Sequence, residues 1–192
     1  MARRAVAKSE LNPSNIREVL LEIYAANDRM NQLLLKHLDP GAWRAKVPGM
    51  KATEGRTIAA IFAHMHNNRL VWLKWSAPHL KCPAPLDFAR CTIGQTANAF
   101  KKSDAGCLQM LEEALSEKPD RRVTRFSRGS WAPHWPAGPT MFAYMFAHDA
   151  HHRGQVIALA HQLGYRLPED GAYGIWHWEK IWKELGFARG PR

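Results

Sequence analysis

Two histidines that stand four residues apart, His148 and His152, are the residues whose spacing most clearly indicates chemistry. In an α-helix, residues four apart differ in direction by only about 40°, so both imidazoles would project from one face, one turn apart. Two bare imidazoles on an apolar face are costly to bury, and a divalent metal ion bound by both removes that cost. Hydrogen-bonded core histidines are the alternative, and the pair alone does not exclude it. The other positions on this face are Met141, Tyr144, Met145, Gln155 and Leu159.

A metal bound in this way needs a third ligand, and an earlier predicted helix offers His64 and His66. These two positions differ by about 200° around a helix, so they cannot both face one ion. Both lie on largely apolar faces and periodicity leaves both open, although Arg69 on the face of His66 slightly favours His64. Three ligands from two neighbouring helices would leave positions for water or substrate, which is typical of a catalytic site.

The residues around the histidine pair refine this chemistry. Asp149 stands where an HExxH motif has glutamate and points about 100° away from the first histidine, so peptide hydrolysis of that type is not supported. His151 lies about 60° to the other side and is predicted to be a neighbour rather than a ligand. Gln155 is expected to hydrogen-bond a ligand or a bound water. Arg153 is expected to pair with an acid across the helices, and close approach of a neighbouring helix would explain Gly154.

Four long helical segments separated by breaker residues would position these side chains. Apolar residues at three- and four-residue spacing and flanking Pro, Gly, Ser and Thr predict helices from Asn12-Pro13-Ser14 to Leu38 and over 57–75, 92–117 and 139–164. Between the last two, the β-favouring pieces 122–126 and 129–131 predict a short hairpin or an ordered crossover, confined to an edge by nearby prolines. A short tryptophan-rich helix over 173–185 is expected to pack across the others. The expected fold is therefore all-α, a four-helix bundle with a short extra C-terminal helix.

Composition sets the broad class of the protein. The 192 residues fit one domain, predicted over 12–192 after a flexible basic tail at 1–11. The net charge is +10, but the basic residues are scattered and no nucleic-acid-binding motif is present, so nucleic acid is not the expected partner. The three cysteines form no CxxC pair, which argues against disulfides or a thiolate zinc site. No apolar run has the length of a membrane helix, and we expect a cytoplasmic protein.

Two stretches resemble the DinB/YfiT-like family of four-helix bundle metalloenzymes. Residues 57–64, TIAAIFAH, are similar to the family's second-helix segment, in which a small polar residue begins an apolar run that ends in a ligand histidine. Residues 148–155, HDAHHRGQ, resemble its signature of a histidine, three residues, and then His-Arg-Gly-Gln. The resemblance spans roughly residues 12–166 and favours His64 over His66. The aromatic segment 173–179 lies beyond it.

The resemblance implies an up-down-down-up bundle in which His64, His148 and His152 bind one divalent ion, zinc or nickel, with iron or manganese also suited to imidazole ligands. Gln155, Tyr144 and Asn68 are the candidates to hydrogen-bond these ligands or to line a pocket. Some relatives resemble transferases that use a low-molecular-weight thiol, so the expected function is a metal-dependent thiol transferase acting on a small-molecule substrate. A metal-dependent hydrolase and a non-catalytic metal-binding, stress-related module are the alternatives. A homodimer is also expected.

Overall fold

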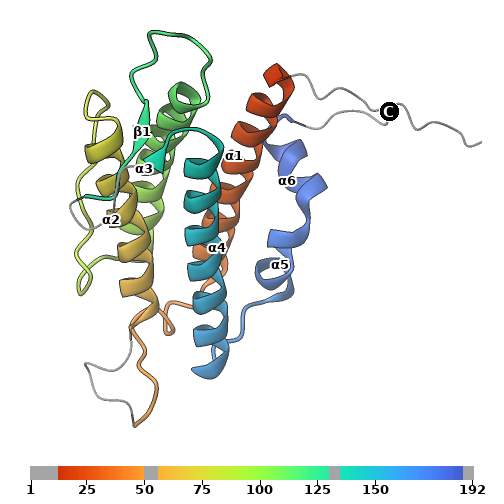
Figure 1. Ribbon diagram of the computed structural model, residues 1–192. Helices are drawn as coiled ribbons and strands as arrows, with labels where there is room; N and C mark the ends of the chain where they lie inside the picture. Colours follow the sequence, from red (N-terminus) through yellow and green to blue (C-terminus); the bar gives the residue numbers. More distant parts are fainter. Residues whose placement is uncertain (1–12, 50–55, 130–134, 188–192) are drawn as a thin grey trace, which may run out of the picture.

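The structure is a computed structural model, and it describes residues 13–49, 56–129 and 135–187. These residues are mostly helical, with one two-stranded sheet of two residues a strand, so the predicted all-α class is confirmed. The predicted basic tail, 1–11, lies outside them. No helix in the described ranges has the length and apolar character needed to cross a membrane. Four long helices lie side by side (Figure 1): α1 (Pro13–His37), α2 (Ile58–Ser76), α3 (Ile93–Ala114) and α4 (Pro139–Gln162).

Local capping sets the helix ends. Thr57 precedes α2 with extended backbone, and its side chain accepts a hydrogen bond from the Ala60 N–H. Thr92 and Gln95 form a reciprocal capping box at the start of α3. Beyond the end of α4, Gly164 has a φ of +83°, a conformation that favours glycine. The predicted bounds hold to within a residue or two except at the end of α3, which stops three residues before the predicted 117.

Each of α1 and α2 packs against both α3 and α4. Their buried apolar residues form two clusters, one that contains Phe62 and Phe100 and another that contains Trp72 and Phe126. Buried polar side chains adjoin these clusters, and the guanidinium of Arg69 lies 4.7 Å from the centre of the Phe100 ring. The candidate site lies next to these polar residues, where α2 and α4 face each other.

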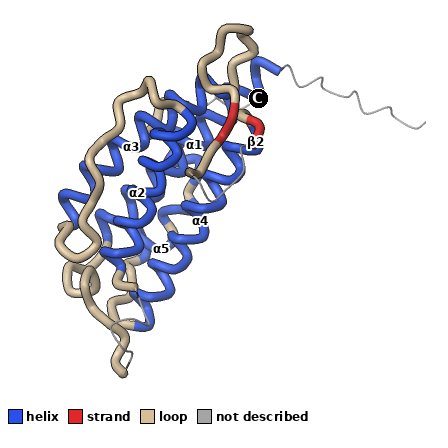
Figure 2. Tube along the Cα trace, turned by 60° about the vertical axis from the view of Figure 1, so that its left-hand side comes forward, coloured by secondary structure: helices blue, strands red, loops and turns tan. Residues whose placement is uncertain are grey.

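A short strand pair lies against α2 and α4 (Figure 2). β1 (Arg125–Phe126) pairs antiparallel with β2 (Trp135–Pro136), and Phe126 stands opposite Trp135. Of the two predicted possibilities, a hairpin or an ordered crossover, the structure therefore has the hairpin, and its first strand lies within the predicted piece 122–126. The second strand lies after the predicted piece 129–131, of which residues 130 and 131 are outside the described residues. Burial explains the register, because Phe126 is fully buried and its ring packs against those of Trp72 and Trp135.

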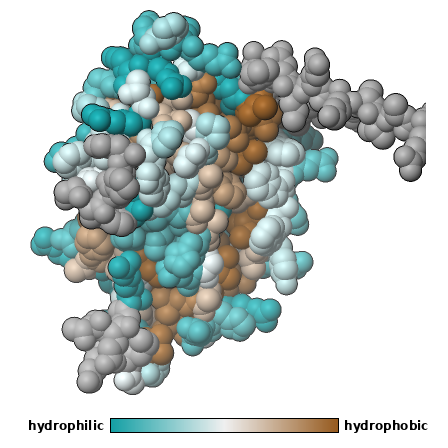
Figure 3. All heavy atoms as spheres, viewed as in Figure 1, coloured by the Kyte–Doolittle hydropathy of each residue, from teal (hydrophilic) through white to brown (hydrophobic). Residues whose placement is uncertain are grey.

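The C-terminal segment consists of α5 (Glu169–Ala172), a 3-10 turn (Gly174–Trp176) and α6 (Trp178–Glu184). The prediction of one helix over 173–185 was wrong, since the backbone leaves helical geometry at His177. Ile175 and Ile181 are both buried. In a continuous helix, residues six apart would point about 240° apart, so one helix would not turn both side chains toward the same neighbour. The segment packs on α1, where Arg29 and Glu184 form a 2.7 Å ion pair. Figure 3 shows hydrophobic residues along the strip between α4 and this segment.

Candidate metal centre

Three histidines from α2 and α4 come together on one side of the four helices. His64, His148 and His152 each offer a ring nitrogen, and these nitrogens all lie within 4.8 Å of one another. The ring of His64 is 5.5 Å from that of His148 and 4.8 Å from that of His152, and the last two rings are 4.5 Å apart. His64 and His148 are partly exposed, whereas His152 is buried. Such a group could hold one divalent metal ion.

His66 lies on the other side of α2. Its ring is fully buried, with Nδ1 3.1 Å from the Ser103 hydroxyl and Nε2 donating to the Ala84 carbonyl at 3.0 Å. Both ring nitrogens therefore have partners within the protein. The structure separates His66 from the cluster and gives it the role of a hydrogen-bonded core residue.

Hydrogen bonds to the cluster hold its imidazoles in the form that binds metals. The Asn68 side-chain amide donates to Nε2 of His64 at 3.1 Å and to Nε2 of His148 at 2.8 Å, so both nitrogens carry a lone pair. His152 donates from Nδ1 to the Gln155 oxygen at 2.7 Å, which leaves its Nε2 unprotonated. Asn68 and Gln155, both candidates from the sequence, thus contact the histidines directly.

The electrostatic surroundings also favour neutral imidazoles. Burial is the main cause that lowers the pKa of His64 to about 4, and the electrostatic effects of His152, Arg56 and His148, which oppose a positive charge on this ring, add to it. Burial also lowers the pKa of His152, and the hydrogen bond that His152 donates to Gln155 only partly opposes it. Both rings are neutral at pH 7, and their lone pairs are available without the release of a proton.

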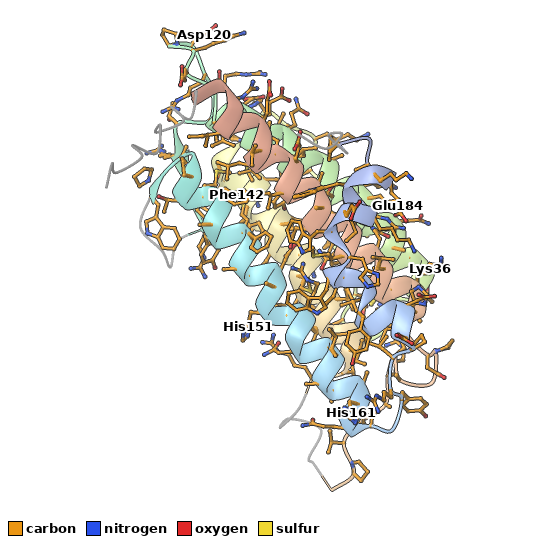
Figure 4. All side chains as sticks on the ribbon, turned by 90° about the vertical axis from the view of Figure 1, so that its right-hand side faces the viewer. Lys36, Asp120, Phe142, His151, His161 and Glu184 are labelled. Carbon is orange, nitrogen blue, oxygen red and sulfur yellow. The ribbon has the colours of Figure 1, made fainter. Side chains whose placement is uncertain are left out.

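Aromatic rings flank the histidines on the side of the strand pair. The Trp72 ring stands edge-on to His148 with centroids 5.2 Å apart, and the Tyr144 ring is 6.3 Å from it. The guanidinium of Arg128 lies 4.4 Å from the centre of the Tyr144 ring. His151 is exposed and projects from the outer side of α4 (Figure 4). The ring of Tyr144 therefore lies beside that of a cluster histidine.

A buried polar network behind the cluster was missed from the sequence. Its centre is the ion pair between Arg69 on α2 and Asp149 on α4, 2.6 Å apart, and both side chains are fully buried. Arg69 also pairs with Asp28 on α1 at 3.2 Å and with Asp104 on α3 at 3.9 Å, so all four helices contribute. The sequence pattern that could have indicated this network is the set of charged and amide side chains on otherwise apolar helix faces. Besides these four, the network contains Asn27, Asn31 and Arg153.

The carboxylates of this network differ in pKa. Burial alone would raise the pKa of Asp149, but the charge of Arg69, the largest of several opposing causes, helps to hold that pKa well below its usual range. Burial raises the pKa of both Asp28 and Asp104, against the opposing charge of Arg69. One guanidinium therefore lowers the pKa of Asp149, whereas burial outweighs its effect on the pKa of the other two carboxyls.

Two expectations about the signature residues were wrong. Arg153 forms no ion pair with an acid among the residues that the structure describes; it donates to the side-chain oxygens of Asn27 at 2.5 Å and Asn31 at 3.1 Å, because Asp149 already takes the charge of Arg69. Gly154 is exposed, and a Cβ built there would meet nothing within 4 Å, so no neighbouring helix requires a glycine.

Comparison with known families assigns the chain to one of them. The model of the DinB family matches residues 11–184, which is most of the chain, and the protein therefore belongs to the DinB family. No curated protein matches it. The family and the three-histidine cluster are together compatible with metal binding.

Proposed function

We propose that this protein is a metal-dependent enzyme that transfers a low-molecular-weight thiol to a small electrophilic substrate. The observation that carries the proposal is the cluster of His64, His148 and His152, whose ring nitrogens lie within 4.8 Å of one another. Two of these rings are partly exposed, so a small molecule can reach the cluster. Buried structural histidines, such as His66, instead have both nitrogens occupied by the protein.

The donor set fits a divalent ion. His64, His148 and His152 would hold it, and three imidazoles suit zinc or nickel, and also iron or manganese. When bound there, such an ion would lower the pKa of a coordinated thiol or water, so that this group could act as a nucleophile at neutral pH. The side-chain amide nitrogen of Asn68 lies within hydrogen-bond distance of Nε2 of His64 and of His148, so a polar group already contacts the two nitrogens that would bind the ion.

Residues around the cluster support a reaction with an anionic thiol. Gln155 keeps the Nδ1 proton of His152 in place, and Trp72 and Tyr144 screen His148 from water on one side. Arg56 acts electrostatically on His64 and lowers its pKa, so there is positive charge near the cluster. This charge would attract the carboxylate of a small thiol.

We further propose that the four long helices form the up-down-down-up bundle predicted from the sequence. The packing of α1 and α2 against the same two helices supports this arrangement. It would bring α2 and α4 alongside each other, which the histidine cluster requires.

The first experiment is metal analysis of protein purified without a chelator or an affinity tag. Wild type should contain, or take up on titration, close to one equivalent of zinc, nickel, iron or manganese. His64→Ala, His148→Ala and His152→Ala should each lose it, whereas His151→Ala, a matched change at an exposed neighbour, should keep it. Wild type that neither contains nor takes up any of these ions would reject the proposal.

Turnover assays then separate the reaction types. The metal-loaded wild type is tested against small electrophiles with and without added thiols, and activity that requires the thiol supports the transferase. Activity without thiol would identify a hydrolase. A tightly bound ion without any turnover or any binding of added thiol would identify a non-catalytic metal-binding module.

A further inference from the structure

The carboxylate of Asp149 uses its two oxygens differently. Oδ2 accepts three hydrogen bonds: from Arg69 at 2.6 Å, from the Asn27 amide at 2.9 Å and from the Asn31 amide at 3.1 Å. Oδ1 accepts none from the described residues although it is fully buried. A buried carboxylate oxygen without a donor is costly, so the surroundings of Oδ1 should contain its partner.

That partner is the preceding residue. Nδ1 of His148 lies 3.7 Å from Oδ1 of Asp149, beyond hydrogen-bond length, and it is itself a buried nitrogen without a partner among the described residues. The two unsatisfied atoms face each other across a gap that a shift of less than about 1 Å would close to an ordinary hydrogen bond. On the other side of the same ring, Nε2 accepts the hydrogen bond of Asn68.

We propose that Asp149 is a positioning residue for His148: its free oxygen holds the proton on Nδ1, so that Nε2 keeps the lone pair needed to bind a metal. The proposal rests on the metal site proposed above. Carboxylates often fix the tautomer and orientation of metal-binding histidines in this way. Here the carboxylate is itself fixed by Arg69 and the two asparagines, which are fully buried.

The crowded oxygen makes Asp149→Asn a sharp test. Three N–H donors converge on Oδ2, so the asparagine must place its single oxygen there and turn its NH₂ group toward Nδ1 of His148. An NH₂ group donates, and Nδ1 would then have to accept, which moves the ring proton to Nε2. The variant therefore stabilises the tautomer that cannot bind metal through Nε2.

Two measurements test the role of Asp149. In metal-free protein, ¹⁵N chemical shifts of the imidazoles should show His148 protonated on Nδ1 in wild type and on Nε2 in Asp149→Asn. Metal affinity, measured by competition with a chromophoric chelator, should fall about 10–100-fold in the variant. The matched control is Asp28→Asn, another buried partner of Arg69 on a different helix, which should change neither the tautomer nor the affinity.

The outcomes are distinguishable from failure of the metal site. Wild-type His148 protonated on Nε2 would overturn the proposal, and this measurement needs neither a metal nor a variant. Equal affinities of wild type and a folded Asp149→Asn would also overturn it, as would an equal loss in Asp28→Asn, which would indicate general destabilisation. If wild type binds no metal, the proposed function falls and the tautomer alone decides what Asp149 does.

Discussion

Removal of the central guanidinium by Arg69→Met tests how the buried charges are balanced. Arg69 has no exposed side-chain surface and lies within 4 Å of carboxylate oxygens of Asp28, Asp104 and Asp149. Methionine preserves much of the apolar stem that packs in the core and removes only the charge and the hydrogen bonds. The variant would leave three buried carboxyls without their shared cation.

The expected loss follows from the burial of the pair. Removal of one partner of a buried ion pair costs about 3–5 kcal/mol, because the remaining charge stays uncompensated. For a domain of this size, that corresponds to a fall in Tm of roughly 6–20 °C. Burial already raises the pKa of Asp28 and Asp104, whereas Arg69 lowers that of Asp149, so Asp149 should account for most of the loss.

Urea unfolding of metal-free protein, followed by far-ultraviolet circular dichroism, measures this loss. Lys74→Met makes a similar change at an exposed position of the same helix and should alter the free energy of unfolding by less than about 0.5 kcal/mol. The double variant Arg69→Met/Asp149→Asn should be more stable than the sum of the two single changes predicts, because the charges are removed together. A loss below about 1 kcal/mol in Arg69→Met would refute the view that Arg69 neutralises this network.

Three further predictions concern residues near the site or the helix ends. Asp104→Asn should stabilise the protein at pH 7 by about 1–3 kcal/mol, because it removes a carboxyl that is costly to ionise in a buried position. Burial raises the folded-state pKa of Asp104 above its unfolded value, so the stability of the wild type falls as the pH rises from about 4 through that raised pKa. The difference in free energy of unfolding should therefore vanish near pH 3, and a destabilised variant at pH 7 would contradict it. Gln155→Leu removes the acceptor of the His152 proton and should weaken metal binding about tenfold with little effect on thermal stability; unchanged affinity in a chelator competition would show that the bond is dispensable. Gly171→Ala should lower the free energy of unfolding by about 1–3 kcal/mol, because its Cβ would lie 2.7 Å from that of His37. Gly94→Ala, where the space is open, should not destabilise, and equal effects of the two changes in urea unfolding would rule out the steric explanation.

Features set by local sequence were the ones that could be predicted. Thr57 and Thr92 act as caps through bonds that span only three residues, and Gly164 ends a helix through its own backbone conformation. The spacing of His148 and His152 likewise depends only on helix geometry. For these reasons the bounds of the long helices and the pairing of the two α4 histidines followed from the sequence.

Features that depend on which surfaces meet could not be derived in the same way. His64 and His66 both lie on apolar faces, and only the position of Ser103 and Ala84 shows which of them is a core residue. The partner of Arg153 depends on the prior pairing of Arg69 with Asp149, a contact between residues 80 positions apart. The second strand follows from the burial of Phe126, which periodicity does not reveal.

The buried network also affects how the helices can align along their axes. Two helices with apolar contact surfaces can slide past each other by one turn, about 5.4 Å, and still bury a similar area. Asp149 receives hydrogen bonds from both α1 and α2, and such a slide of α4 would take its carboxylate out of reach of all three donors. Misaligned packings therefore leave Arg69 and Asp149 buried and unpaired. The same contacts that penalise them set His148 and His152 level with His64, so a single axial register supports both folding and the candidate metal centre.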